Sequence, residues 1–131
     1  MYLIDTQIFI WTLVRPETLS AGTKRILENE FIFVSQISLF EITIKQKIGK
    51  LPELALSTNE LANRVGNDGF NLLDLKTKHL EAYTKIPLKG NHRDPFDRLL
   101  LATALSENLA NISADENFKL YAPQVSVFGN D

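Results

Sequence analysis

The chain has no cysteine among its 131 residues, so disulfide bonds and thiolate metal sites are excluded. It has only two histidines, and a structural zinc site is therefore not expected either. No apolar run approaches the roughly 18 residues of a membrane span, and no basic segment with an apolar run indicates a secretory signal. We therefore expect a cytoplasmic protein without membrane association.

The chain also has no excess of positive charge: it contains 14 Lys and Arg and 16 Asp and Glu, which gives a net charge of -2. This total does not indicate nucleic-acid binding, although local patches matter more than the sum. The length favours a single domain over residues 1–131, with no linker, repeat or low-complexity tract. A chain of this size buries roughly two thirds of its unfolded surface on folding and needs no disulfide bond or structural metal for stability.

What the chain does have is a regular alternation of strand-like and helix-like segments. Short apolar or β-branched runs predict strands at 2–4, 31–34, 70–75, 110–113 and 125–128. The intervening patterns favour helices after Asp5, from Ser20 to about Glu28, from Ser38 (a capping box with Glu41) towards Gly49, from about Ser57 to Gly66, at 77–83 and at 95–107, with a last turn holding Phe118 and Tyr121. This order predicts an α/β fold, a three-layer α/β/α single domain whose central sheet is mainly parallel.

The sharpest local pattern is Asp-Pro-Phe-Asp-Arg at residues 94–98, which opens an apolar helix. Pro95 suits the first helical position because it has no N–H to leave unpaired. Asp94 before it is typical of an N-cap, whereas Asp97 can project past the mouth of the helix. The apolar run from Leu99 predicts that the helix is buried. We therefore assign capping mainly to Asp94 and a functional role to Asp97.

Four acids fall where the carboxyl ends of parallel strands meet, and ligands bind at that edge of such sheets. Asp5 follows the first strand, Glu41 lies one helical turn past the second, and Asp115 follows the fourth. Asp97 faces the same edge if its helix is a crossover. Each acid alone could be a cap or an ion-pair partner, so the argument rests on their convergence. Converging carboxylates repel one another, and Mg²⁺, or Mn²⁺ with the same oxygen ligands, relieves that repulsion.

Basic residues near these acids are candidates for an anionic substrate. Arg93 and Arg98 flank the acid pair, and a guanidinium matches a phosphate in a bidentate way; the alternative is a solvated charge or an ion pair. Lys45 and the lysines after it form either a solvated face or a nucleic-acid track. Trp11 is interpreted as core or interface, and His79, in an amphipathic segment, is assigned no function.

Four short motifs occur in order along the chain. They are Leu-Ile-Asp-Thr at 3–6, Ser-Gln-Ile-Ser-Leu-Phe-Glu-Ile at 35–42, His-Arg-Asp-Pro-Phe-Asp-Arg at 92–98 and Ile-Ser-Ala-Asp-Glu-Asn-Phe at 112–118. Together they resemble the PIN-domain ribonucleases, and most closely the VapC toxins of bacterial toxin–antitoxin pairs. The resemblance covers essentially the whole chain, and its third motif is the most specific.

The resemblance implies a PIN-like α/β/α domain with Mg²⁺- or Mn²⁺-dependent endoribonuclease activity on an RNA substrate. The family's acidic quartet carries over onto Asp5, Glu41, Asp97 and Asp115. Ser113 matches the hydroxyl residue that accompanies the last acid, and Thr6 and Asp94 are secondary candidates. The resemblance also implies a homodimer and a cognate antitoxin that inserts into the active-site groove.

The chain departs from the family pattern at two positions, neither of which touches the quartet. Gln7 stands where many relatives have histidine, and Ala114 stands where a polar or basic residue is common. We expect Asp5 and Asp97 to be the principal metal ligands, and the other two acids to complete the site, one of them orienting a water.

Other α/β proteins with acidic sites fit less well. A receiver domain needs paired acids after the first strand, and a haloacid-dehalogenase-type phosphatase needs a second Asp at position 7, which is Gln. The alternative that stays open is a catalytically silent PIN-like module that only binds RNA or a partner.

Overall fold

The computed structural model describes residues 1–89 and 94–131, so Arg93 lies outside the described residues. In the described part, five strands form one sheet in the order β3-β2-β1-β4-β5, and every neighbouring pair is parallel. The strands are β1 (Tyr2–Ile4), β2 (Ile32–Ser35), β3 (Asn71–Leu73), β4 (Ala110–Ser113) and β5 (Val127–Gly129). In the central strand, Ile4 lies opposite both Val34 and Ile112.

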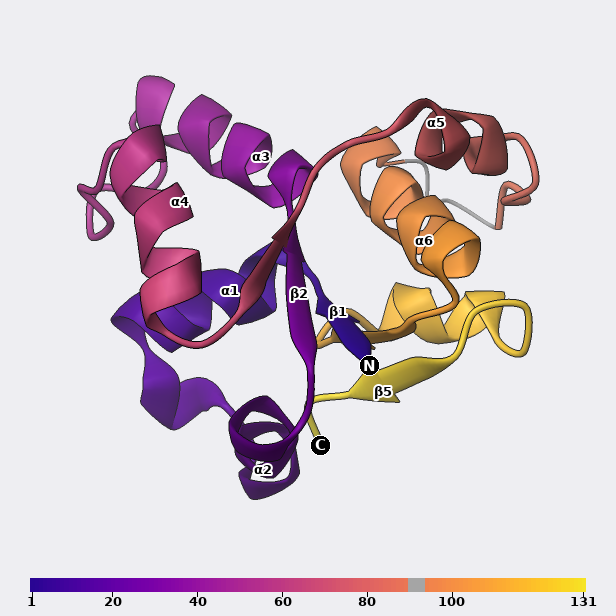
Figure 1. Cartoon of the computed structure of the whole chain (residues 1–131), viewed down its shortest axis with the longest axis horizontal. Coiled ribbons are helices and arrows are strands. Elements are labelled where there is room, and N and C mark those ends of the chain that lie inside the picture. The colour runs from indigo at the N-terminus through magenta and orange to yellow at the C-terminus, as the bar shows by residue number, and fades with distance from the viewer. Residues whose placement is uncertain (90–93) are drawn as a thin grey trace.

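Helices cover both faces of this sheet (Figure 1). They are α1 (Thr6–Val14), α2 (Ala21–Asn29), α3 (Gln36–Lys47), α4 (Thr58–Asn67), α5 (Thr77–Tyr83) and α6 (Pro95–Glu107), with the short 3₁₀ helices η1 (Pro16–Thr18) and η2 (Glu116–Tyr121). Figure 1 shows α1, α3 and α4 on one side of the sheet and α5 and α6 on the other. None of the described helices is long and apolar enough to cross a membrane.

The two faces of the sheet carry separate cores, because successive side chains of a strand point to opposite sides. Leu3 and Ile4 are both fully buried, but Ile4 packs with α1, α3 and α4, whereas Leu3 packs with α5, α6 and η2. Apolar side chains thus lie on both faces of β1, as expected for a strand between two helical layers. The predicted three-layer α/β/α fold is confirmed.

The predicted capping box at Ser38 is wrong, because α3 begins three residues earlier. Ser35 is the N-cap, and its hydroxyl oxygen accepts the N–H of Ile37 at 3.0 Å. Ser38 is instead buried inside the helix, with its Oγ 2.9 Å from Oγ1 of Thr6 in α1. Glu41 therefore lies in the second turn of α3 and does not cap the helix.

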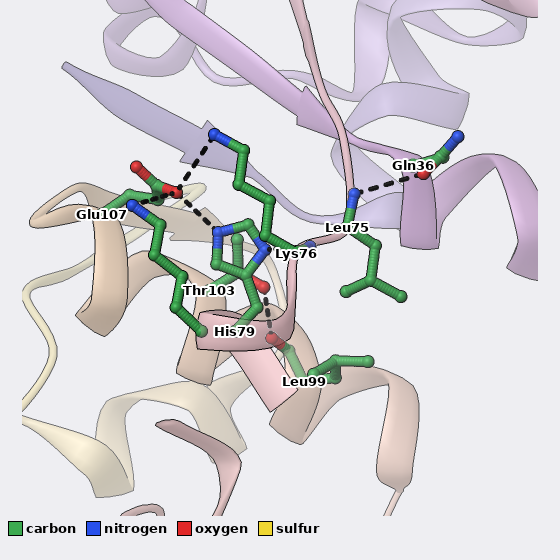
Figure 2. Close-up of polar contacts among 8 residues, drawn as sticks. Gln36, Leu75, Lys76, His79, Leu99, Thr103 and Glu107 are labelled. Carbon is green, nitrogen blue, oxygen red and sulfur yellow. Dashed lines mark hydrogen bonds and ion pairs between the residues drawn. The ribbon is translucent and has the colours of Figure 1, made fainter. Parts of the chain in front are cut away.

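Helices α5 and α6 are joined by a polar cluster, the α5–α6 seam, formed by Lys76, Lys78, His79 and Glu107 (Figure 2). His79 is fully buried, its Nδ1 accepts the N–H of Lys76 at 3.0 Å, and its Nε2 lies 2.6 Å from Oε2 of Glu107. Because Nδ1 is an acceptor, these contacts assign the proton to Nε2, which donates to Glu107. Lys78 Nζ lies 3.2 Å from the same oxygen. His79 therefore has a structural role.

Candidate active site

The carboxyl edge of the sheet is open where β1 meets β4. The chain runs from β1 through β2 to β3 on one side and later returns to β4 and β5 on the other. Such a change of direction leaves a crevice outside the strand ends. A cleft of about 390 Å³ opens there, lined by Asp5, Thr6, Gln7, Trp11, Glu41, Lys45, Asp94, Asp97, Ala114 and Asp115.

Asp5 lies at the bottom of the cleft and is only 4% exposed. It is the N-cap of α1: Oδ1 accepts the N–H of Ile8 at 2.8 Å, and Oδ2 accepts the hydroxyl of Ser113 at 2.5 Å. Burial raises the pKa of Asp5 to about 7, against the two hydrogen bonds, and the charges of Asp97 and Glu41 raise it further. The carboxylates are thus close enough to repel one another.

Glu41 is oriented by residues of two helices. The hydroxyl of Thr6, at the start of α1, donates to Oε1 at 2.7 Å. Lys45, four residues further along α3, has its Nζ 3.7 Å from Oε2 and keeps a side chain that is 36% exposed. Lys45 therefore already has an acidic partner, although it also lines the cleft.

The start of α6 separates the roles of its two acids. Asp94 is the N-cap, with Oδ1 accepting the N–H of Phe96 at 2.8 Å and of Asp97 at 3.3 Å, and Pro95 follows as the first helical residue. The capping prediction for Asp94 is confirmed. Asp97 stands in the first turn, lines the cleft and contributes to the raised pKa of Asp5.

Asp115 is held beside Asp5 through a shared serine. Its backbone N–H donates to the hydroxyl oxygen of Ser113 at 3.0 Å, while that hydroxyl donates to Asp5. Its own Oδ1 accepts the N–H of Asn117 at 2.9 Å and caps η2. All four predicted acids therefore line one cleft, with Thr6 and Ser113 as hydrogen-bond donors to two of them.

The prediction that Arg98 contacts RNA is wrong. Its side chain is 3% exposed, and its guanidinium donates to the carbonyl oxygens of Ile86 and Pro87, both at 2.7 Å, and to the hydroxyl of Tyr83 at 3.2 Å. Consecutive helical residues point about 100° apart. Asp97 therefore faces the cleft, whereas Arg98 is directed into the layer of α5.

Trp11 and Gln7 also line the cleft, although neither was among the predicted site residues. They are four residues apart on α1, so they lie on one helix face. Because this helix face directly follows Asp5, the spacing of Gln7 and Trp11 indicates that α1 forms one wall of the cleft.

The donor atoms of the cleft suit a hard divalent cation, since they are carboxylate and hydroxyl oxygens without sulfur. Within residues 1–89 and 94–131, no three acidic or histidine side chains are grouped so that they could hold a metal ion together. Mg²⁺ typically binds through one or two carboxylates and keeps waters for contacts with phosphate, rather than entering an all-protein cage. An open cluster of this kind fits that mode of binding.

Residues 2–123 match the family model of the PIN domain. The chain belongs to the PIN domain family. This confirms the resemblance inferred from the four motifs, and it places the acidic cleft in a family of nuclease type. No curated protein matches this PIN domain by sequence.

Solved structures share the fold of this PIN domain over nearly its whole length. VapBC2 from Rickettsia felis, bound to promoter DNA, aligns with a TM-score of 0.67 and 18% identity, covering 99% of this chain and 98% of that one. FitAcB from Neisseria gonorrhoeae gives 0.65 and 24%, with 99% and 98% covered. A toxin–antitoxin complex from Klebsiella pneumoniae gives 0.64 and 20%, with 100% and 98% covered.

Proposed function

We propose that this PIN domain is a metal-dependent endoribonuclease, the VapC-type toxin of a toxin–antitoxin pair. The observation that carries the proposal is the set of four carboxylates, those of Asp5, Glu41, Asp97 and Asp115, around one cleft at the carboxyl edge of the sheet. Unused carboxylates gathered in this way would repel one another with no compensating gain. Its RNA substrate would be found in the cytoplasm.

In this proposal Asp5 and Asp97 hold Mg²⁺ or Mn²⁺, directly or through water, and Glu41 and Asp115 complete the site. A bound divalent ion lowers the pKa of a coordinated water and neutralises charge that builds on the phosphate. The chain supplies the orientation: Ser113 and the N–H of Ile8 fix both oxygens of Asp5.

Glu41 and Asp115 differ in how they are held. Thr6 and Lys45 contact both oxygens of Glu41 and fix its direction, whereas Asp115 is oriented through its own capping contact. Partners of this kind keep ligands aligned, and losing one typically lowers activity or metal affinity about 10- to 100-fold. Either acid is placed to orient the attacking water.

The test is cleavage of RNA by the purified chain with Mg²⁺, with EDTA, and as Asp97→Asn. We expect cleavage only with metal, and a loss of at least about 100-fold in the variant, since it removes a principal ligand. Glu116→Gln is the matched control, because Glu116 neighbours Asp115 but pairs with Lys119 outside the cleft. If Asp97→Asn cleaves like the parent, the site assignment is wrong; if the parent only binds RNA, the silent-module alternative replaces the enzyme.

A cognate antitoxin is the second part of the proposal. It is supported by the fold shared with toxin–antitoxin complexes and by an open cleft that a partner segment can enter. Expression of the chain alone should arrest growth, and co-expression with the protein encoded beside it should restore growth. Arrest that persists with every neighbouring gene would contradict this part alone.

A homodimer is the third part, supported by apolar side chains left at the surface of α3 and beyond β3. Phe40 is 60% exposed and contacts Phe96 edge to face, and Leu75 is 40% exposed while its N–H donates to Gln36. Burial of such side chains favours association. We expect the mass of a dimer in sedimentation, and a monomer for Phe40→Ser; a monomeric parent would refute this part.

A further inference from the structure

A second hollow, of about 310 Å³, adjoins the active-site cleft. Gln7, Trp11 and Lys45 line both, so the two join into one groove along α1 and α3. Beyond these shared residues, the second hollow carries Arg15 and Lys50, and we call it the basic hollow. The groove therefore changes the sign of its charge along its length.

Local structure brings Arg15 and Lys50 into the wall of the same hollow. Arg15 ends α1, and its N–H donates to the carbonyl of Trp11 at 2.9 Å, one turn back. At the end of α3, Gly49 adopts φ 72°, its N–H donates to Gln46, and the N–H of Lys50 returns to the carbonyl of Lys45 at 2.9 Å. This is the Schellman turn, for which glycine is favoured because the conformation is strained for other residues. It turns Lys50 back against the last turn of α3.

The charge balance of the basic hollow favours an anionic occupant. Arg15, Lys45 and Lys50 face a single acid in its wall, Glu53. Lys45 is paired with Glu41, whereas Arg15 and Lys50 are exposed and form no ion pair with any residue of the described ranges. Part of their placement is explained by the negative ends of two helices, which favour cations. The helix ends do not explain why Arg15 and Lys50 both lie at the rim of an acidic cleft.

Trp11 lies at the junction of the cleft and the basic hollow and is half-buried. Its inner part packs against the core of α1, which fixes the indole. A fixed aromatic ring beside cations is the combination that binds single-stranded nucleic acids, with bases stacked on the ring and phosphates on the cations. A base within a duplex is already stacked and paired, so it cannot use such a platform.

We propose that this groove holds a single-stranded segment of RNA, with one base stacked on Trp11 and the phosphates beyond it contacted by Arg15 and Lys50. The inference rests on the proposed function, since it takes the acidic cleft as the place of cleavage. It adds the residues that hold the strand beside the cleft and the direction in which the strand leaves it.

The test measures binding of a fluorescently labelled, mixed-sequence single-stranded RNA to Asp97→Asn, which keeps RNA intact, over a series of salt concentrations. Adding Lys50→Gln or Arg15→Gln should lower the slope of log K against log[salt] by about 0.7 each, the value for one lost phosphate contact. Lys47→Gln is the matched control, since Lys47 is an exposed lysine of α3 that lines neither hollow.

Trp11 is tested in the same background with Trp11→Leu, which keeps an apolar side chain, and Trp11→Phe, which keeps an aromatic face. Loss of stacking should weaken binding roughly tenfold in the first, and the second should stay near the parent. A blunt duplex of the same sequence should bind more weakly than the single strand. With the cleaving parent, the same substitutions should raise KM and leave kcat unchanged.

Four results would each overturn the proposal. One is an equal effect of Lys50→Gln and Lys47→Gln, which would indicate diffuse surface charge. Another is unchanged binding by Trp11→Leu, or a duplex bound as tightly as the single strand. The last is a loss of antitoxin binding with RNA binding intact, which would assign the basic hollow to a protein partner. Because binding is measured without cleavage, a parent that fails to cut RNA refutes the proposed function and leaves this test decisive.

Discussion

The acidic cleft and the α5–α6 seam are both clusters of charged side chains, but they are built in opposite ways. In the seam, Glu107 accepts a hydrogen bond from His79 and faces Lys76 and Lys78. The contact with His79, and after it that with Lys78, lowers the pKa of Glu107. In the cleft, Asp5 is buried among other acids, and its pKa is raised to about 7. A cluster that satisfies its own charges holds helices together, whereas one that does not is suited to bind a cation.

The same contrast appears between two consecutive residues of α6. Asp97 faces the cleft, and Arg98 is buried against the carbonyl oxygens of Ile86 and Pro87. Both residues are charged and they are neighbours in the sequence, so it is the partners of each side chain that separate function from structure.

The largest effect should come from Arg98→Met, which keeps an apolar stem but removes every donor. The carbonyl oxygen of Ile86, in a buried hydrogen bond, and that of Pro87, in a partly buried one, would lose their partners, and we expect a loss of roughly 4 kcal/mol in the free energy of unfolding. Urea denaturation measures it, with Asp97→Asn expected within about 1 kcal/mol of the parent. If Arg98→Met keeps the stability of the parent but loses RNA binding, Arg98 would instead be a residue that contacts RNA.

The next largest effect is a gain of stability in Asp5→Asn at pH 8 without metal. The folded pKa of Asp5, about 7, lies above the ordinary value of 3.8, so the favourable contribution of Asp5 is complete below pH 4 and is lost as pH rises through 7. Removing the charge should recover roughly 2 to 4 kcal/mol at pH 8 and little at pH 4. Urea denaturation of both proteins at both pH values checks this, and equal destabilisation at both would contradict a buried, charged Asp5.

A smaller effect is expected within the seam. His79→Ala removes a buried ring with hydrogen bonds to Lys76 and Glu107, and should cost roughly 2 kcal/mol. Lys78→Gln, on the exposed side of the same cluster, should change stability by less than about 1 kcal/mol. Thermal unfolding of the two variants measures both changes in stability. We expect both variants to cleave RNA as the parent does. If His79→Ala loses cleavage at a temperature at which it is folded, the seam has a role in function.

The smallest effect is the response of stability to metal. A cation bound only by the folded state at ten times its dissociation constant stabilises by roughly 1.4 kcal/mol, or several degrees in Tm. Mg²⁺ or Mn²⁺ should therefore raise the Tm of the parent and leave that of Asp97→Asn nearly unchanged. An equal rise in both would place the cation outside the cleft.

Elements specified by neighbouring residues could be predicted from the sequence. The bounds of α5, α6 and β4 are those predicted, because Asp94 and Pro95 define the start of α6 locally. The start of α3 could not be predicted from the sequence, since Ser35 and Ser38 are both suitable N-cap residues. The choice is set by the end of β2 and by the contact of Ser38 with Thr6, which is distant in sequence.

The candidate site shows the same division. Its acids were found because strand ends of a parallel sheet meet at one edge, and all four line the cleft. The burial of Arg98 could not be predicted, because its partners are Tyr83, at the end of α5, and two carbonyl oxygens of the segment after it, whose path the sequence does not specify. The roles of the acids in catalysis stay predictions until the variants are made.

The position of β1 also sets the order in which the protein acquires its site. This strand pairs with β2 and with β4, and Asp5 meets Ser113 across 108 positions of sequence. Contacts this distant form late, because the whole intervening chain must first be made and closed. During synthesis, Asp5 therefore has neither its serine nor Asp97 and Asp115 until nearly all of the chain has emerged. Under the proposed function, a nascent copy would therefore lack the complete site for cleaving the RNA that encodes it.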